Sequence, residues 1–308
     1  MVLYLAPLRG VTDYIFRSVY AAHFKGFNCA MAPFITSVRG AAIKPSHIKD
    51  VVLQNNRLLP VIPQILSNNA QEFVVLARQL YELGYTTVNW NIGCPFPQVT
   101  KKKRGAGLLA HPDIIDAFLD QVTTNIPNIL SIKTRLGLLS KKEMHGFLPV
   151  FNKYPLAEIV LHPRTAAQMY TGVVDLEGFN EFLAASAHPV MYNGDIVTRE
   201  FFQKISSLFP AVSSWMIGRG AIMYPLLAQS LRGDDTNTSA LPARIKKFHD
   251  ALVARYRDCM ENPGNVLDKM KGVWLYLSHS LPDGKKALKR IQKVKRLDLY
   301  EKIVEEIV

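Results

Sequence analysis

The chain has 308 residues, a formal net charge of +12 and 48 % hydrophobic residues. This composition excludes a disordered chain, and the absence of any run of about 18 apolar residues argues against a transmembrane helix. The apolar start at residues 1–7 lacks the basic region of a signal peptide. We therefore expect a cytoplasmic protein with no membrane partner.

Eight short runs rich in apolar and β-branched residues alternate with helix-sized intervals up to about residue 232. Such strands pair in parallel through crossovers, and eight of them close a (β/α)8 TIM barrel. The alternative is a doubly wound open sheet, but the turn at residues 6–10 lacks the GxGxxG spacing usual in that fold. The expected strands of the barrel are Leu3–Ala6, Cys29–Ala32, Pro60–Gln64, Thr87–Asn91, Leu130–Thr134, Glu158–His162, Val190–Asn193 and Ser214–Ile217.

Three of the intervals carry clear signals of helix starts and ends. In Asn69–Leu83, apolar residues recur at helical spacing, and Gly84 follows as a C-terminal cap. Pro112 is suited to the first turn of a helix, and Thr198 is a typical N-cap. These intervals are therefore expected to form crossover helices.

The composition becomes polar and loses its periodicity over residues 232–239, which indicates a linker. We predict a barrel domain over residues 1–235 and a small all-helical domain over residues 240–308. The helical patterns after the linker, which include no strand candidate, cover Pro242–Met260, Asn265–His279 and Gly284–Val308.

Basic residues gather in the loop at residues 101–104 and in the segment 285–296. Clustered Lys and Arg attract polyphosphates and speed the encounter with them. The net charge alone fits a generic solubility surface equally well. The uneven distribution favours a nucleic-acid partner.

The three cysteines, Cys29, Cys94 and Cys259, are widely separated and lack CxxC spacing. This pattern argues against a disulfide framework and a zinc site, so no metal is expected. Cys29 and Cys259 are expected to be inert thiols in packed regions. Cys94 differs because it follows a predicted strand end, between Gly93 and Pro95 and close to a basic loop. This placement suits proton transfer at a polyanionic substrate.

Polar residues stand at the ends of the predicted strands, where the active site of a (β/α)8 barrel lies. Barrel interiors are normally filled by Val, Ile and Leu, so this ring of polar groups indicates a site rather than packing. Its members are Arg9, Gln64, Asn91, Cys94, Lys133, Arg135, His162, Arg164, Asn193, Asp195 and Arg219.

The last two strand ends have the composition of a phosphate site. Gly194, Gly218 and Gly220 allow backbone amides to approach a phosphate closely, and Arg219 adds a positive charge. Lys133 and Gln64 could reach a flat heterocycle from the barrel mouth. A phosphate at one end and an ammonium with an amide at a ring suggest FMN as the cofactor.

These motifs, in this order, resemble those of the tRNA-dihydrouridine synthases. The resemblance covers the whole barrel and, more loosely, the helical tail, and GCP together with HxRT is its most specific part. The chain departs from the family pattern at Asn89, at Pro163 and at Arg9, which replaces a small residue. The motifs are APLRGVTD at 6–13, NIGCP at 91–95, GAGLL at 105–109, IKTRLG at 132–137, LHPRT at 161–165, NGD at 193–195 and IGRG at 217–220.

The resemblance implies a two-step oxidoreductase acting on tRNA. NADPH reduces FMN, hydride passes from flavin N5 to C6 of a uridine, and Cys94 delivers a proton to C5. The hydride donor rests on the resemblance alone, and no obligate protein partner is predicted. Cofactor contacts are implied for Pro7, Leu8, Arg9, Gln64, Lys133, His162, Asn193, Gly194, Asp195, Gly218 and Arg219. Contacts with the RNA substrate are implied for Asn91, Lys101, Lys102, Lys103, Arg135 and Arg164.

The proton on Cys94 raises a physical question. An ordinary thiol has a pKa near 8.5 and is protonated at neutral pH, but neighbouring cations favour the thiolate. A general acid at this position therefore needs burial or substrate contact to retain its proton. Two other functions remain open: an FMN barrel that reduces a free pyrimidine or an enone, and a non-catalytic RNA-binding barrel.

Overall fold

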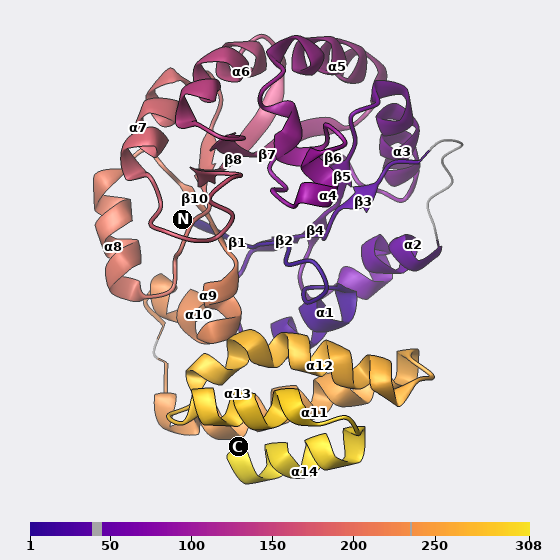
Figure 1. Cartoon of the computed structure of the whole chain (residues 1–308), viewed down its shortest axis with the longest axis vertical. Helices are drawn as coiled ribbons and strands as arrows, with labels where there is room; N and C mark the ends of the chain where they lie inside the picture. The colour runs from indigo at the N-terminus through magenta and orange to yellow at the C-terminus, as the bar shows by residue number, and fades with distance from the viewer. Residues whose placement is uncertain (39–44, 235) are drawn as a thin grey trace.

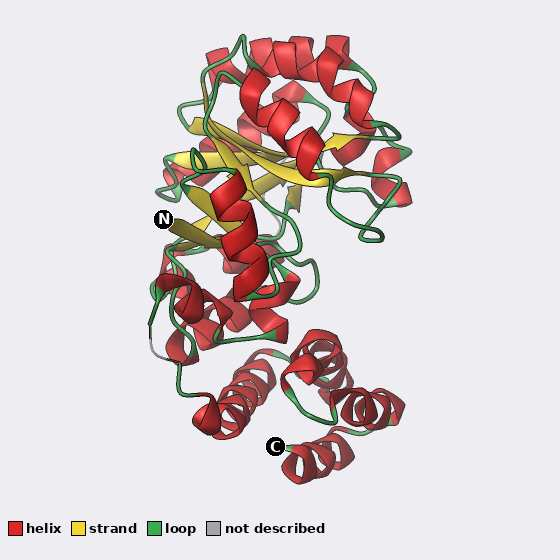
Figure 2. Ribbon diagram, turned by 90° about the vertical axis from the view of Figure 1, so that its left-hand side faces the viewer, coloured by secondary structure: helices red, strands yellow, loops and turns green. Residues whose placement is uncertain are grey.

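The computed structural model describes residues 1–38, 45–234 and 236–308, so the predicted barrel boundary at residue 235 lies outside the described residues. Strands surrounded by helices form the larger part of the molecule, and the C-terminal helices lie together at one end (Figures 1 and 2). Among the described residues, no helix is both long and apolar enough to cross a membrane.

The described strands form one curled parallel sheet in the order β3-β5-β6-β7-β8-β9-β10-β1-β2-β4. This arrangement confirms the predicted (β/α)8 TIM-barrel class. The strands are β1 Val2–Leu5, β2 Cys29–Met31, β3 Ile35–Thr36, β4 Val61–Ile62, β5 Gln64–Leu66, β6 Thr87–Asn91, β7 Ile129–Gly137, β8 Leu156–Thr165, β9 Val190–Tyr192 and β10 Ser214–Ile217.

The third predicted strand, Pro60–Gln64, is in fact two short strands. Proline has no backbone N–H for a ladder hydrogen bond, and Pro63 separates β4 from β5. β4 pairs with β2, whereas β5 pairs with β6 and with the short β3 that the sequence did not predict. The barrel therefore closes through residues 61–66.

Strands β7 and β8 extend beyond the predicted ends at Thr134 and His162. They remain paired as far as Gly137 and Thr165, with a register shift after Arg135. This extension places Arg135 and Arg164 within strands rather than in the following loops.

The helices of the barrel begin where their capping residues predict. Asn69 Oδ1 accepts a hydrogen bond from Glu72 N at 3.0 Å, and Thr198 Oγ1 accepts one from Phe201 N at 3.1 Å. Pro112 is the first residue of its helix. The α-helices are α1 Tyr14–His23, α2 Pro45–Val51, α3 Ala70–Glu82, α4 Pro97–Thr100, α5 Pro112–Asn125, α6 Met144–Phe151, α7 Leu176–Ala185, α8 Arg199–Leu208, α9 Arg219–Met223 and α10 Leu227–Arg232.

The C-terminal part consists of helices α11 Leu241–Cys259, α12 Pro263–Leu277, α13 Gly284–Lys293 and α14 Leu297–Ile307. The last predicted helical segment, Gly284–Val308, is thus two helices. Lys271 Nζ donates to the carbonyl of Gln292 at 3.1 Å, which satisfies an acceptor at the end of α13 and lets the chain turn.

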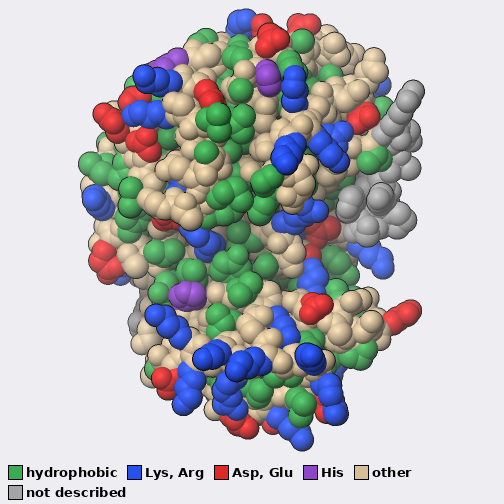
Figure 3. All heavy atoms as spheres, in the orientation of Figure 1, with side chains coloured by type: hydrophobic (Ala, Val, Ile, Leu, Met, Phe, Trp, Pro, Cys, Tyr) green, Lys and Arg blue, Asp and Glu red, His purple; other side chains and the backbone are tan. Residues whose placement is uncertain are grey.

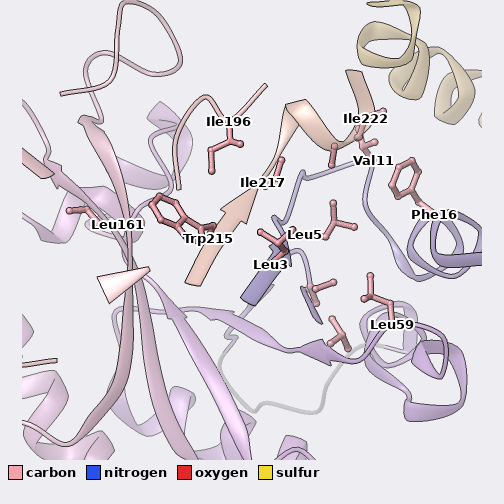
Figure 4. Close-up of a cluster of buried hydrophobic side chains, with 14 of the residues drawn as sticks. Leu3, Leu5, Val11, Phe16, Leu59, Leu161, Ile196, Trp215, Ile217 and Ile222 are labelled. Carbon is pink, nitrogen blue, oxygen red and sulfur yellow. The ribbon is translucent and has the colours of Figure 1, made fainter. Parts of the chain in front are cut away.

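Apolar side chains from strands and helices form a continuous core, part of which is drawn in Figure 4. Trp90 of β6 stacks on Phe118 of α5, with ring centroids 4.1 Å apart. Phe248 of α11 packs edge-on against Phe16 of α1 and so joins the C-terminal helices to the barrel.

A polar contact also connects the loop after β1 to the C-terminal helices. Asp13 accepts hydrogen bonds from Tyr256 Oη at 3.0 Å and from Lys269 Nζ at 2.7 Å. Lys269 Nζ also donates to Gly10 O at 3.2 Å. The C-terminal helices therefore hold the loop that begins at the barrel mouth.

Candidate active site

A cavity of about 370 Å³ opens at the carboxyl ends of the barrel strands. Its size is within the range of small-ligand sites. Among the predicted site residues, Arg164 and Lys101–Lys103 do not line it. Those that do are Pro7, Leu8, Arg9, Gln64, Asn91, Cys94, Lys133, Arg135, His162, Asn193, Gly194, Asp195, Gly218 and Arg219.

A chain of buried amides forms one part of the cavity wall. Asn91 Nδ2 donates to Gln64 Oε1 at 2.7 Å, and Gln64 Nε2 donates to Asn89 Oδ1 at 2.7 Å. Asn89 Nδ2 in turn donates to Ser131 Oγ at 2.9 Å. Asn91 Oδ1 accepts from Cys94 N at 2.9 Å. Asn91, expected to contact the substrate, therefore also shapes the turn that carries the thiol.

The Cys94 thiol lies in an apolar environment. Its side chain is 7 % exposed and belongs to a cluster with Leu66 and Val99, against which Phe34 and Phe96 pack. Burial raises the pKa of Cys94, and this effect outweighs the opposing charges, of which Arg9 is the strongest. A raised pKa favours the protonated thiol at neutral pH, which is the form that a general acid needs.

The other two thiols differ in their surroundings. Cys29 is half-buried in β2, and burial raises its pKa to about 12, as suits an inert thiol. Cys259 is exposed at the end of α11. The prediction that Cys259 lies in a packed region is therefore wrong, because the chain leaves the helix at that residue.

The basic loop is fixed to the Cys94 turn by a close backbone contact. Gly105 has φ +54°, and a Cβ at this position would lie 2.9 Å from Cys94 Cβ. Ala106 N donates to Cys94 O at 3.1 Å. Lys101–Lys103 precede this contact and are exposed. They follow Cys94 closely in the sequence but do not line the cavity.

Lys133 is a half-buried cation in the cavity lining. Its Nζ donates to Asn193 Oδ1 at 2.6 Å, and Asn193 Nδ2 donates to Met216 O at 2.9 Å. Burial, followed by the charge of Arg135, lowers the pKa of Lys133 to about 7. Unlike an ordinary lysine, this side chain changes charge near neutrality.

Arg164 lies beneath the cavity wall. It is 1 % exposed, and its guanidinium pairs with Asp195 and donates to Gly172 O at 2.6 Å. Arg219 Nη2 donates to the same carboxylate of Asp195 at 2.6 Å. Arg164 therefore does not line the cavity itself, but it binds Asp195, which does. Its predicted contact with the substrate stays a prediction.

His162 is a neutral imidazole in this environment. Its Nε2 lies 3.1 Å from Arg164 Nη1, which can only donate. Burial, followed by the charges of Arg135 and Lys133, lowers the pKa of His162 well below its ordinary value. His162 Nε2 therefore acts as an acceptor here.

Arg135 joins the Cys94 turn to the loop after β8. It donates to Gly93 O at 3.0 Å and to Met169 O at 2.7 Å, and its guanidinium lies 5.1 Å from the ring centroid of Tyr170. Arg219 approaches the same ring at 5.5 Å. Tyr170 is thus held between two cations at the mouth.

The cavity also includes residues that the sequence analysis missed. Tyr170 follows the HxRT motif, so its position after a strand end could have identified it. Leu275 and Tyr276 come from α12, and no strand-end pattern marks them. The additional lining residues include Pro33, Phe34, Phe96, Tyr170, Leu275 and Tyr276.

The two glycines of the GRG motif serve different purposes. A Cβ on Gly218 would lie 3.5 Å from Ala6 Cβ, which is ordinary contact at the cavity wall. A Cβ on Gly220 would lie 2.0 Å from Ile196 O, so that glycine is required for packing of the two loops. Of these two glycines, only Gly218 has space beside its backbone for a ligand to approach closely.

The residues present fit a flavin phosphate. Ala6, Met216 and other apolar side chains form a cluster inside the barrel that reaches the cavity. Lys133 brings its amino group, and Gln64 its amide, to this apolar surface. Arg219, whose side chain is 32 % exposed, supplies a positive charge that could bind a phosphate. Such a combination of apolar walls and a few convergent polar groups is typical of cofactor sites.

Comparison with known proteins gives a consistent result. A family model described as dihydrouridine synthase (Dus) matches residues 4–302. The chain is 28 % identical over 241 residues to the tRNA-dihydrouridine synthase B of Vibrio vulnificus, covering 78 % of this chain and 74 % of that protein. It is 25 % identical over 307 residues to the tRNA-dihydrouridine(16) synthase of Cupriavidus necator, covering 94 % and 93 %.

Solved structures show the same fold at low sequence identity. Histamine dehydrogenase from Rhizobium sp. 4-9 matches with a TM-score of 0.57 at 10 % identity, over 80 % of this chain and 46 % of that one. Morphinone reductase in complex with tetrahydroNAD matches with a TM-score of 0.54 at 10 % identity, over 76 % and 87 %. The chain therefore spans less than half of the histamine dehydrogenase and most of the morphinone reductase.

Proposed function

The chain belongs to the dihydrouridine synthase family of oxidoreductases, and from this premise we propose that it uses FMN and NADPH to reduce the C5–C6 double bond of specific uridines in tRNA. The observation that carries the proposal is the convergence of Cys94, Lys133 and Gln64 on one cavity at the barrel mouth. The thiol of Cys94 and the residues proposed to bind the cofactor therefore line the same cavity.

Cys94 is the proposed general acid. Reduction of the double bond requires a hydride at C6 and a proton at C5, and the thiol S–H bond breaks as the C5–H bond forms. Burial keeps the thiol protonated until the substrate binds, as the raised pKa indicates. The nearby cations Arg9, Arg135 and Lys133 then stabilise the thiolate that remains.

The cofactor is proposed to lie along the barrel mouth. A bound FMN would supply the hydride, with NADPH as the source of electrons. Pro7, Leu8 and Arg9 would line its ring, and Gln64 and Lys133 would contact the polar edge. The ribityl and phosphate groups would be held by His162, Asn193, Gly194, Asp195, Gly218 and Arg219.

In this proposal the barrel, residues 1–235, is the catalytic domain, and residues 240–308 bind RNA. Figure 3 shows Lys and Arg side chains gathered over the C-terminal helices. Lys285, Lys286 and Lys289 of α13 are exposed there. A uridine must leave its stack to enter the cavity, and contacts with the RNA backbone offset that cost. Lys101–Lys103 would add backbone contacts beside Cys94.

The test is Cys94→Ala. We expect the variant to retain flavin absorbance and NADPH-dependent flavin reduction, because the thiol contributes to neither. Dihydrouridine formation in unmodified tRNA, measured by mass spectrometry, should fall by about 10²–10⁴-fold, which is the usual contribution of a positioned acid.

The matched control is Cys259→Ala, which removes an exposed thiol at the end of α11 that does not line the cavity. It should leave dihydrouridine formation unchanged. Unchanged turnover in Cys94→Ala would remove Cys94 from the mechanism. A wild-type enzyme that reduces free uracil or an enone but not tRNA would reject the proposed substrate.

A further inference from the structure

One side of the cavity mouth carries a cation without an internal counter-ion. Arg9 is exposed, and its guanidinium carbon lies 5.4 Å from the ring centroid of Phe34. Phe34 and Phe96 are half-buried and pack against the cluster that contains Cys94. All of these residues line the same cavity.

The other cavity arginines are already engaged. Arg135 donates to backbone carbonyls, and Arg219 donates to Asp195. In the described part of the chain, no carboxylate lies within ion-pair distance of Arg9, and its guanidinium makes no hydrogen bond. Its charge is therefore available to a ligand at the mouth.

The backbone that carries Arg9 is held on both sides. Leu8 N donates to Thr12 Oγ1 at 2.8 Å, and Gly10, at φ +84°, accepts from Lys269 Nζ at 3.2 Å. The ring of Phe34 supports the guanidinium from below. A fixed backbone and a stacked side chain make Arg9 a directed group, in contrast to a long surface side chain without neighbours.

We propose that Arg9 and Phe96 form a subsite for the nucleotide next to the target uridine. Arg9 pairs with the phosphodiester that links the two nucleotides, Phe34 orients the guanidinium, and Phe96 offers its ring to the adjacent base. A base drawn into the cavity leaves its flanking phosphate at the mouth, and guanidinium groups match phosphate oxygens with two parallel hydrogen bonds. The inference rests on the proposed function, since it requires RNA as the substrate.

The first experiment measures the affinity of the flavin-loaded enzyme for an unmodified tRNA transcript at several salt concentrations. Each phosphate contact contributes about 0.7–0.9 to the slope of log affinity against log salt. Arg9→Ala should reduce that slope by this amount, and Arg9→Lys should retain most of it. The matched control, Arg199→Ala, removes an exposed arginine of α8 and should leave the slope unchanged. An unchanged slope in Arg9→Ala would overturn the proposal.

The second experiment locates the phosphate. A methylphosphonate placed beside the mapped target uridine removes one negative charge from the RNA. Wild-type enzyme should lose about as much affinity from this change as from Arg9→Ala, and the two changes together should cost no more than either alone. Fully additive losses would overturn the pairing of Arg9 with that phosphate.

NADPH is another source of phosphate at this mouth. A rise in the NADPH concentration needed for half-maximal flavin reduction in Arg9→Ala, with an unchanged salt slope for RNA, would assign Arg9 to the dinucleotide and overturn the proposal. Phe96→Leu keeps an apolar side chain but removes the aromatic face. It should weaken RNA binding about 5-fold or more without changing the salt slope, because stacking is not an ionic contact.

These outcomes separate the subsite from the proposed function. If wild-type enzyme forms dihydrouridine in tRNA and the Arg9 variants keep the wild-type slope, only the subsite is wrong. If wild-type enzyme forms none, the proposed function itself is wrong, and the subsite fails with it.

Discussion

The two sides of the cavity mouth hold their cations in different ways. On the Asp195 side, Arg164 and Arg219 share one carboxylate, and Arg164 is almost completely buried. On the Cys94 side, Arg9 is exposed over an aromatic ring. On the Asp195 side the protein itself balances one of the two guanidinium charges, whereas the charge of Arg9 is balanced only when an anion binds.

This difference has a physical cause. A buried cation costs several kcal/mol unless a counter-ion accompanies it, so Asp195 stabilises the fold by pairing with Arg164. A cation at a solvent-exposed mouth costs little and gains energy when it meets a phosphate. The Asp195 side thus maintains the shape of the site, while the Cys94 side is suited to exchange its partners during turnover.

The largest effect is expected from Asp195→Asn. Asn also tolerates the positive φ of 43° at this position, so the change mainly removes the charge. Arg164 then remains buried without a counter-ion, and the free energy of unfolding should fall by about 3 kcal/mol. The carboxylate is 28 % exposed, which keeps the loss at the low end for a buried pair. Urea denaturation of the flavin-free protein measures it.

The control for this prediction is Glu306→Gln. Glu306 pairs with Arg290 on the surface, where the two side chains are 60 % and 42 % exposed. A surface pair contributes about 0–1 kcal/mol, so this variant should unfold almost like the wild type. If both variants lose the same free energy of unfolding, the pairing of Asp195 with Arg164 stabilises the protein no more than an ordinary surface ion pair does.

The next effect concerns the Cys94 side. In Gly105→Ala the new Cβ would lie 2.9 Å from Cys94 Cβ and 2.8 Å from Cys94 O, so the thiol turn must move. We expect a loss of about 2 kcal/mol in unfolding free energy from overpacking and backbone strain, together with reduced dihydrouridine formation. Flavin absorbance should remain, because the cofactor groups lie elsewhere.

Gly233→Ala separates the two causes of that loss. Gly233 also has positive φ, +85°, but nothing lies within 4 Å of a Cβ added there. This variant should lose only about 1 kcal/mol from backbone strain and should retain full activity. If both variants behave alike, the contact between Gly105 and Cys94 does not position the thiol.

The strand pattern was sufficient to predict the barrel and the convergence of polar residues at its mouth. Parallel strands present their carboxyl ends at one edge, so Gln64, Lys133 and Asn193 could be assigned to one site from their positions alone. The roles of Arg135 and Arg164 were less predictable. They depend on how far β7 and β8 extend, and on the register shift beside Pro163.

Two other features depend on tertiary contacts that no local pattern encodes. Tyr276 enters the cavity because α12 docks beside the barrel. The pKa of Cys94 is raised by burial, in a cluster against which Phe34 and Phe96 pack, and burial outweighs the cations visible in the sequence. Sequence spacing locates a thiol, whereas its pKa depends on the side chains that exclude water from it.

The smallest expected effect concerns Lys133, which lies between the two sides. Its pKa is about 7 in the folded protein, and a lysine in the unfolded chain has a pKa of about 10.4. Between these values the unfolded state binds more protons, so the contribution of Lys133 to stability rises with pH. Below about pH 7 both states are protonated and the contribution stays at its minimum.

Lys133→Met removes this titration while keeping an unbranched side chain. The wild type should gain stability relative to the variant between about pH 7 and about pH 8.5, by at most about 1.4 kcal/mol per pH unit. The partial exposure of Lys133 at the cavity makes a smaller slope, near 1 kcal/mol per pH unit, the expected result. Urea denaturation of both flavin-free proteins across this range measures the difference. A stability difference that does not change with pH would show that the amine remains hydrated. Lys133 would then carry a permanent positive charge in the cavity, as Arg9 does at its mouth.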